Sequence, residues 1–84
     1  MAYRIEISSI ARRQIKKLAR SVQDRIRVRI RKLAEEPRPR GCTKLVNEDE
    51  YRIRVGDYRV IYEIYDDELV VKILEAGHRR DIYR

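Results

Sequence analysis

Apolar residues recur along the chain with two different periods, and the change of period divides the chain into elements. Residues 3–8 alternate apolar with polar, which predicts a strand that buries one face. Between residues 10 and 20, and again between residues 22 and 36, apolar residues recur every three or four positions, which predicts two helices. The second helix should stop at Glu36, because a proline follows it.

The junction between the two predicted helices is short. Ser8 or Ser9 is placed to cap the first helix, and Ser21 with Asp24 resembles a capping box for the second. So few residues separate the helices that we expect them to form an antiparallel hairpin.

After a rigid connector at residues 37–41 the pattern indicates four more strands, at about residues 43–46, 51–55, 58–65 and 69–76. The order predicts an α+β fold: an N-terminal strand, a two-helix antiparallel hairpin and a four-stranded antiparallel meander, with the helices packed on one face of an antiparallel sheet. The chain is short enough for residues 1–84 to form one domain.

Gly56 and Asp57 suit a two-residue hairpin turn of type II′ or I′, since glycine accepts positive φ. Such a turn pairs Arg54 with Arg59 and places both, with Arg52, on the face away from the helices. The residues expected to face the helices are Tyr51, Ile53, Val55, Tyr58, Val60, Tyr62, Ile64, Leu69, Val71 and Ile73.

In a meander the chain after residue 76 returns to the end of the sheet that carries Gly56. We therefore expect His78, Arg79, Arg80 and Tyr83 near the arginines, and the acidic residues other than Asp57 and Asp81 far from them. Two arginines directly opposite each other are unfavourable unless an anion lies between them, and a phosphate would meet that need. The pattern favours an RNA-binding surface; a solvated or packed strand face is the alternative.

The charge is unevenly distributed. The chain holds 21 Lys and Arg against 14 Asp and Glu, a net charge of +7. Residues 1–40 contain 13 basic against 4 acidic residues and residues 41–84 contain 8 against 10, so the excess lies in the first half. Such a balance indicates an anionic partner, either a nucleic acid or an acidic protein.

Cysteine and histidine are too few for several other functions. Cys42 is the only cysteine and His78 the only histidine, which excludes an internal disulfide, a thiolate metal cluster and an all-histidine metal site. We therefore expect no metal and no cofactor. The sequence holds neither an apolar run near the ~20 residues of a membrane span nor a secretory signal, so the cytoplasm is the expected compartment.

Residues 51–62, YRIRVGDYRVIY, followed by residues 77–83, GHRRDIY, resemble the signature of RelE-type toxins in the RelE/ParE superfamily of type II toxin-antitoxin systems. The resemblance spans nearly the whole chain, including the predicted helical hairpin. It implies an endoribonuclease that cleaves mRNA in the ribosomal A site. In that reaction the 2′-OH attacks the adjacent phosphate and leaves a 2′,3′-cyclic phosphate, and no metal is implied.

The resemblance also implies roles for individual residues. Arg59 would bind the scissile phosphate, Arg79 would act beside it, and Tyr83 would stack on or orient a base. Arg52 and Arg54 stand where relatives carry lysines. Because a guanidinium stays protonated, we expect these two to stabilise charge rather than to accept a proton.

Histidine is the side chain that ordinarily titrates near neutral pH, so His78 is a candidate general acid or base. Binding to ribosomal RNA, capping of the tail and simple solvation are the alternatives for this residue.

The resemblance further implies partners. A RelB-like antitoxin with an acidic and apolar segment would wrap the domain in a hetero-oligomeric complex, and the basic helices would contact ribosomal RNA. Two other functions stay open. One is a ParE-like inhibitor of DNA gyrase with the same fold, and the other is a non-catalytic RNA-binding protein or inactive toxin homologue.

Overall fold

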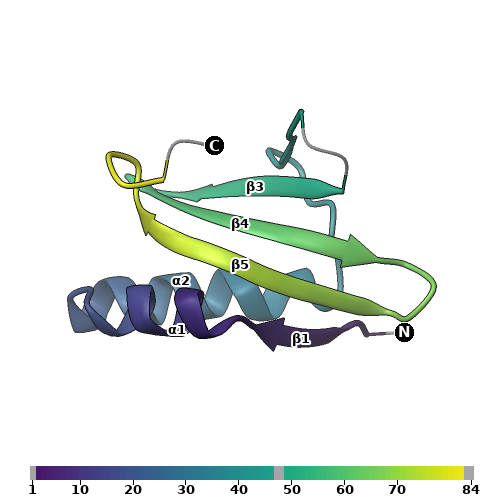
Figure 1. Ribbon diagram of the computed structural model, residues 1–84, viewed down its shortest axis with the longest axis horizontal. Helices are drawn as coiled ribbons and strands as arrows, with labels where there is room; N and C mark the ends of the chain where they lie inside the picture. Colours follow the sequence, from purple (N-terminus) through teal and green to yellow (C-terminus); the bar gives the residue numbers. More distant parts are fainter. Residues whose placement is uncertain (1, 47–48, 83–84) are drawn as a thin grey trace.

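Two helices cover one face of a five-stranded sheet (Figure 1). The computed structural model describes residues 2–46 and 49–82. Its elements are β1 (Arg4–Ile7), α1 (Ser9–Lys16), α2 (Arg20–Leu33), β2 (Thr43–Lys44), β3 (Glu50–Val55), β4 (Tyr58–Tyr65) and β5 (Val70–His78). The predicted α+β class and the one-sided helical layer are confirmed. No helix in this described part of the chain is long and apolar enough to span a membrane.

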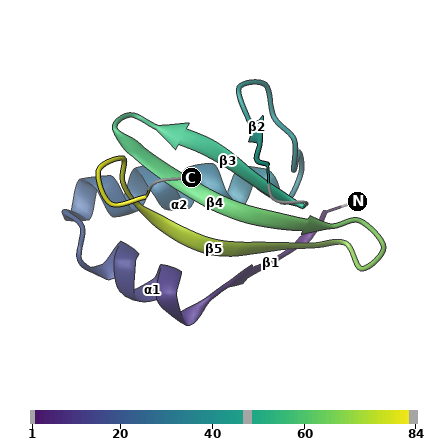
Figure 2. The ribbon, with the colours of Figure 1, turned by 45° about the horizontal axis from the view of Figure 1, so that its top comes forward.

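The sheet is mixed, so the expectation of a purely antiparallel sheet is wrong for one strand. Its order is β1-β5-β4-β3-β2, and β1 pairs in parallel with β5, with Arg4 opposite Val70. The other pairs are antiparallel, as expected. The parallel pairing follows from the path of the chain. The helical hairpin returns the chain to the end of the sheet where β1 began, so β3 and β5 run in the same direction as β1 (Figure 2).

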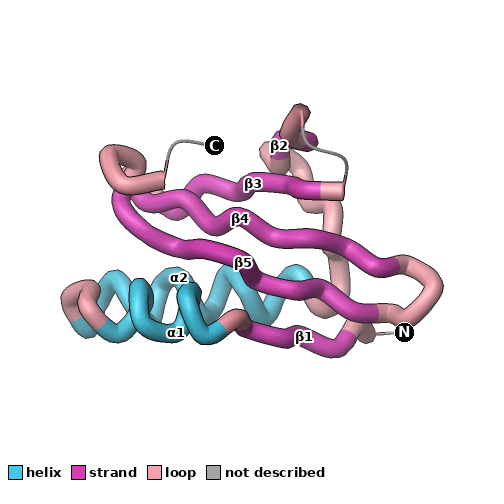
Figure 3. The backbone as a smooth tube through the Cα atoms, viewed as in Figure 1, coloured by secondary structure: helices cyan, strands magenta, loops and turns pink. Residues whose placement is uncertain are grey.

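The helix boundaries differ from the predicted ones. Ser8 caps α1 as expected, its hydroxyl accepting from the Ala11 N–H at 3.0 Å. Helix α1 then ends at Lys16, and α2 begins at Arg20 after Ala19, which makes no side-chain capping bond, so the predicted capping box at Ser21 is wrong. The chain still turns back between the two helices, and the predicted hairpin is confirmed (Figure 3).

The limits of the strands also differ from the predicted ones, most of all in β2 and β5. Strand β2 is only two residues long, and β5 begins one residue later than predicted and extends two residues further, to His78. Leu69, expected in the helix-facing layer, lies instead in the turn before β5 with φ 55°. The predicted turn at residues 47–50 lies partly outside the described residues.

The core lies between the sheet and the helices. The helices contribute Ala11, Ile15, Ile26, Ile30 and Leu33, and the central strands contribute Ile53, Val55, Val60, Tyr62, Ile64, Val71, Ile73 and Ala76. Tyr51 and Tyr58 are half-buried against this layer. Apart from Leu69, the predicted helix-facing set is therefore confirmed, and the face that carries the arginines is the open one.

A β-bulge interrupts β5. Ile61 pairs with Glu75 but the next residue, Tyr62, pairs with Ile73, so Leu74 is the extra residue. The Leu74 carbonyl accepts a hydrogen bond from the Ser8 hydroxyl at 2.9 Å.

The bulge reverses which side chains of β5 face the helices. With Leu74 inserted, Ala76 rather than Glu75 enters the core, and Ala76 N–H donates to Gln14 Oε1 at 2.9 Å. Because alternation resumes from there, His78 points to the helix side, whereas Glu75 points to the open face and Gly77 lies opposite Arg59.

Candidate functional site

The β3–β4 hairpin brings two arginines into direct opposition. Arg54 pairs with Arg59 and Val55 with Tyr58 across the Gly56–Asp57 turn, as the sequence predicts. Gly56 has φ +61°, whereas Leu69 is the only described non-glycine residue with positive φ, so the turn is of type II′ rather than I′. We call the open face of the sheet, with Arg52, Arg54 and Arg59, the arginine face.

Arg52 lies one step further from the turn, opposite Ile61. It is half-buried, whereas Arg54 is exposed. Burial, followed by the positive charges of Arg54 and Arg59, lowers the pKa of Arg52 below its ordinary value. The register places Arg52, Arg54 and Arg59 on the same face of two neighbouring strands, so their positive charges act on one region of the surface.

Arg79 joins the pair from the end of β5. Its N–H donates to the Asp57 carbonyl at 2.9 Å, which ties the tail to the hairpin turn. A pocket of about 100 Å³ is lined there by Arg54, Gly56, Asp57, Tyr58, Arg59 and Arg79, and we call it the turn site. The predicted return of the chain to the Gly56 end is therefore confirmed for Arg79.

The tail beyond β5 folds over the arginine face. Ile82 is buried, and a Cβ on Gly77 would lie 3.4 Å from the Ile82 side chain, so the missing side chain of Gly77 makes room for it. Arg59 Nη1 donates to the Ile82 carbonyl at 2.9 Å. Sequence reasoning missed this anchor, although a glycine inside a strand is a signal of close approach.

The structure does not bring His78 to the turn site. His78 pairs directly with Tyr58, whose ring it meets edge-on at 5.4 Å between centroids on the helix side. Its Nδ1 accepts the Arg80 N–H at 3.1 Å and so closes the turn that follows β5. Arg80 itself is exposed, and Tyr83, the predicted base-stacking residue, lies outside the described residues.

One acidic residue comes closer than expected. Because of the bulge, Glu75 lies on the arginine face in the same row as Ile61 and Arg52. The expectation that the acidic residues other than Asp57 and Asp81 are held away from this face is wrong for Glu75. Sequence alternation counted from Ile73 would have placed Glu75 among the core residues.

The arrangement defines a cationic surface that is suited to phosphate. Guanidinium groups donate paired hydrogen bonds to phosphate oxygens, and three of them converge at the turn site. Arg54 and Arg59 lie directly opposite each other, and their repulsion favours an anion between them. The fold and site therefore define a small α+β protein with a cationic surface on the open face of its sheet.

Comparison with known proteins shows which family has this architecture. Residues 5–83 match the family described as ParE toxin of type II toxin-antitoxin system, parDE. The mRNA interferase toxin RelE of Escherichia coli K12 is 26% identical over 81 residues, covering 94% of this chain and 85% of the relative.

Solved structures of related proteins have the same fold. A chain of the archaeal RelE-RelB complex from Pyrococcus horikoshii superimposes with a TM-score of 0.83 at 34% identity, covering 94% of this chain and 97% of that one. A chain of the toxin-antitoxin complex RelBE2 from Mycobacterium tuberculosis gives a TM-score of 0.84 at 29% identity, covering 94% and 93%. The chain belongs to the ParE toxin family of type II toxin-antitoxin systems, within the RelE/ParE superfamily.

Proposed function

We propose that this toxin is an mRNA interferase of the RelE type, a ribosome-dependent endoribonuclease that cleaves mRNA in the A site. The observation that carries the proposal is the convergence of Arg54, Arg59 and Arg79 on one pocket. The similarity to the E. coli mRNA interferase toxin over 94% of the chain supports the reaction class.

In the proposed reaction the 2′ oxygen forms a bond to the adjacent phosphorus, and the bond from phosphorus to the 5′ oxygen breaks. The products are a 2′,3′-cyclic phosphate and a free 5′-OH, so one proton leaves the 2′-OH and one reaches the 5′ oxygen. Negative charge builds up on the phosphate oxygens in the transition state. Arg59 and Arg79 stabilise that charge, and no metal ion is needed for this step.

Arg52 and Arg54 have a supporting role in this proposal. Both are guanidinium groups and stay protonated, so they hold phosphate oxygens of the same strand rather than accept the 2′ proton. Tyr83 keeps its proposed role of stacking on a base. His78 acts as a positioning residue, because its ring lies on the helix side and its Nδ1 holds the turn that carries Arg79.

The test is cleavage of mRNA on programmed ribosomes, with cut sites mapped by primer extension. We expect cuts only at the codon in the A site, and Arg59→Ala should reduce single-turnover cleavage by roughly 10²–10³-fold. Arg40→Ala, at an exposed arginine of the connector before β2, is the matched control and should cleave at the wild-type rate. Intact mRNA with active ribosomes would refute the proposal.

A second candidate function is inhibition of DNA gyrase, and the match of the chain to the ParE toxin family favours it. A supercoiling assay with purified gyrase separates the two functions. Inhibited supercoiling together with intact ribosome-bound mRNA would establish the ParE-like activity in place of the ribonuclease.

We also propose that a RelB-like antitoxin neutralises the chain in a hetero-oligomeric complex. Of the two solved relatives described above, one is a toxin-antitoxin complex and the other is a RelE-RelB complex. The basic surface of this chain complements an acidic segment. A short acidic protein, if one is encoded beside this gene, should abolish cleavage at an equimolar amount.

A further inference from the structure

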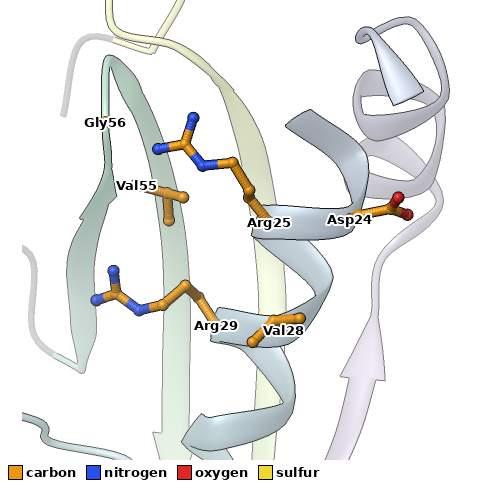
Figure 4. A pocket seen from close by; sticks show the side chains of 6 residues that line it. All are labelled: Asp24, Arg25, Val28, Arg29, Val55 and Gly56. Atoms are coloured by element: carbon orange, nitrogen blue, oxygen red, sulfur yellow. The ribbon is translucent and has the colours of Figure 1, made fainter. Parts of the chain in front are cut away.

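Gly56 lies between two basic pockets. One is the turn site described above, and the other, of about 370 Å³, lies between α2 and the tip of the β3–β4 hairpin. The second pocket, which we call the α2 pocket, is lined by Asp24, Arg25, Val28, Arg29, Val55 and Gly56 (Figure 4). Because both pockets share Gly56, an extended ligand that fills one can continue into the other.

Two arginines of the α2 pocket reach from the helix toward the hairpin (Figure 4). Arg29 Nη1 donates to the Arg54 carbonyl at 3.2 Å. The Arg25 guanidinium lies against Gly56, with Nη2 2.9 Å from the point that a Cβ would occupy. A backbone without a side chain at Gly56 therefore lets both the guanidinium and a ligand approach the turn closely.

The α2 pocket carries two cationic side chains, Arg25 and Arg29, against one acidic side chain, Asp24. Asp24 points away from the two arginines, and its Oδ1 lies 4.0 Å from Arg20 Nε. In residues 2–46 and 49–82 the ion pairs with measured distances include neither Arg25 nor Arg29. Like charges one helical turn apart are destabilising, and an anion between them removes that cost.

The chemistry of the lining selects a nucleotide rather than a bare ion. A guanidinium has five N–H donors, so Arg29 keeps donors for an anion after its bond to Arg54. Val28, which lines the same pocket as Val55, is 41% exposed and offers an apolar surface for a ribose or a base. A phosphate with an attached ring is the ligand that uses both features.

We propose that the α2 pocket is a second phosphate subsite, which binds another phosphate of the same RNA strand whose scissile phosphate occupies the turn site. The strand passes around the hairpin tip at Gly56, with Arg54, Arg59 and Arg79 on one side and Arg25 and Arg29 on the other. This inference rests on the proposed ribonuclease function and extends its binding surface to a helix of the opposite layer.

The test measures binding of single-stranded RNA by fluorescence anisotropy, with an octanucleotide and a dinucleotide that each carry a 2′-deoxy residue to prevent cleavage. The double variant Arg25→Gln/Arg29→Gln should bind the octanucleotide roughly tenfold more weakly, the effect of one lost charge-assisted contact. The loss for the dinucleotide should be much smaller. The slope of log K against log salt for the octanucleotide should fall by about 0.7, the value for one phosphate of a single strand.

Arg13→Gln/Arg31→Gln is the matched control, because it removes the same charge from exposed positions that line neither pocket. An equal loss in this control would overturn the inference in favour of general electrostatic attraction. An equal loss for both RNA lengths would overturn it in favour of a role in holding the hairpin. Unchanged octanucleotide binding with lost antitoxin binding would assign the pocket to an acidic protein instead.

Two further measurements keep the outcomes distinct. Arg25→Gln alone leaves the bond between Arg29 and Arg54 in place, so it reports on the pocket if the double variant fails to fold. Cleavage on programmed ribosomes tests the proposed function by itself. A wild-type protein that cleaves mRNA but whose α2-pocket variants show no length-dependent loss would overturn this inference alone.

Discussion

Gly77 controls how closely the tail approaches the arginine face. A Cβ at this position would lie 3.4 Å from Ile82, which is ordinary van der Waals contact, whereas a larger side chain would occupy the place of Ile82. We expect Gly77→Ala to cleave at nearly the wild-type rate. Gly77→Val should displace Ile82 and with it the carbonyl that holds Arg59, and should cost about 1–3 kcal/mol in stability by overpacking.

The measurement for Gly77 is single-turnover cleavage together with urea unfolding. An equal loss of activity in the alanine and valine variants would contradict a steric origin. Unchanged cleavage in a folded Gly77→Val protein would show that the position of Ile82 does not matter for the site.

Variants of His78 distinguish a role in proton transfer from a role in positioning the turn after β5. His78→Asn keeps an acceptor close to the place of Nδ1 for the Arg80 N–H but removes the imidazole ring. We expect its cleavage rate to stay within a fewfold of the wild-type rate and to depend on pH between 6 and 8 as the wild-type rate does. His78→Ala, which lacks the acceptor, should be slower across the same range.

Rates for the His78 variants come from single-turnover cleavage on programmed ribosomes. A rate loss in His78→Asn of several orders of magnitude, or a change in the shape of its pH profile, would instead assign proton transfer to this ring.

At the scale of the element, the β5 bulge decides which residues form the arginine face. The bulge leaves Ala76 N–H without a partner strand, and the Gln14 side chain from α1 accepts it at 2.9 Å. Removing that acceptor in Gln14→Ala leaves a part-buried N–H unsatisfied, which should lower the free energy of unfolding by about 1–3 kcal/mol.

Urea unfolding measures the effect of Gln14→Ala, and Gln14→Glu is the control because it retains an acceptor of the same length. The glutamate variant should lose less stability than the alanine variant. Equal losses would mean that packing around α1, rather than the bond to the bulge, is what the residue contributes.

At the scale of the whole molecule, Asp66 joins three distant segments. The Tyr3 hydroxyl donates to Asp66 Oδ1 at 2.7 Å, and Arg38 Nη2 donates to Oδ2 at 2.9 Å. The bonds from Arg38 and then from Tyr3 lower the pKa of Asp66 below its ordinary 3.8. Strand β1, the connector before β2 and the β4–β5 turn are thereby held together.

The direction of the Asp66 shift predicts the pH dependence. Since the folded pKa is the lower one, ionised Asp66 stabilises the fold fully above the unfolded value of about 3.8 and loses this contribution as pH falls through the folded value. Wild type should therefore exceed Asp66→Asn in melting temperature near neutral pH, and the difference should shrink below about pH 4 to 5.

Thermal unfolding over a pH series checks the Asp66 prediction. Asp67→Asn is the matched control in the same turn, because Asp67 is exposed and belongs to none of the measured ion pairs among the described residues. A difference between wild type and Asp66→Asn that is constant with pH would contradict the role of the charge.

Much of the molecule was determined by local pattern. The change from a period of two to a period of three or four indicated the strands and helices, and the Gly56–Asp57 turn set the pairing of Arg54 with Arg59. These features follow from sequence because side-chain periodicity and turn geometry act over a few residues. The RelE/ParE resemblance of residues 51–62 and 77–83 was likewise readable without coordinates and is confirmed by the family match.

Other features depend on contacts between residues far apart in the chain. The parallel pairing of β1 with β5 follows from the path of the helical hairpin, and the bulge at Leu74 needs Ser8 and Gln14 from the N-terminal part. The one-residue shift turns His78 away from the arginine face and brings Glu75 onto it. No local pattern encodes this shift, because Ser8 and Gln14, whose side chains hydrogen-bond to the bulge, lie more than sixty residues away in the sequence.

The sequence by itself thus determined the class of fold, the hairpin and the identity of the arginines on its open face. The tertiary structure alone decided which of the tail residues reach them. It placed Arg79 at the turn, His78 behind the sheet, Ile82 over Gly77, and the α2 arginines beside Gly56. The physical reason is that periodicity specifies a face of one element, whereas a site is made by the packing of several.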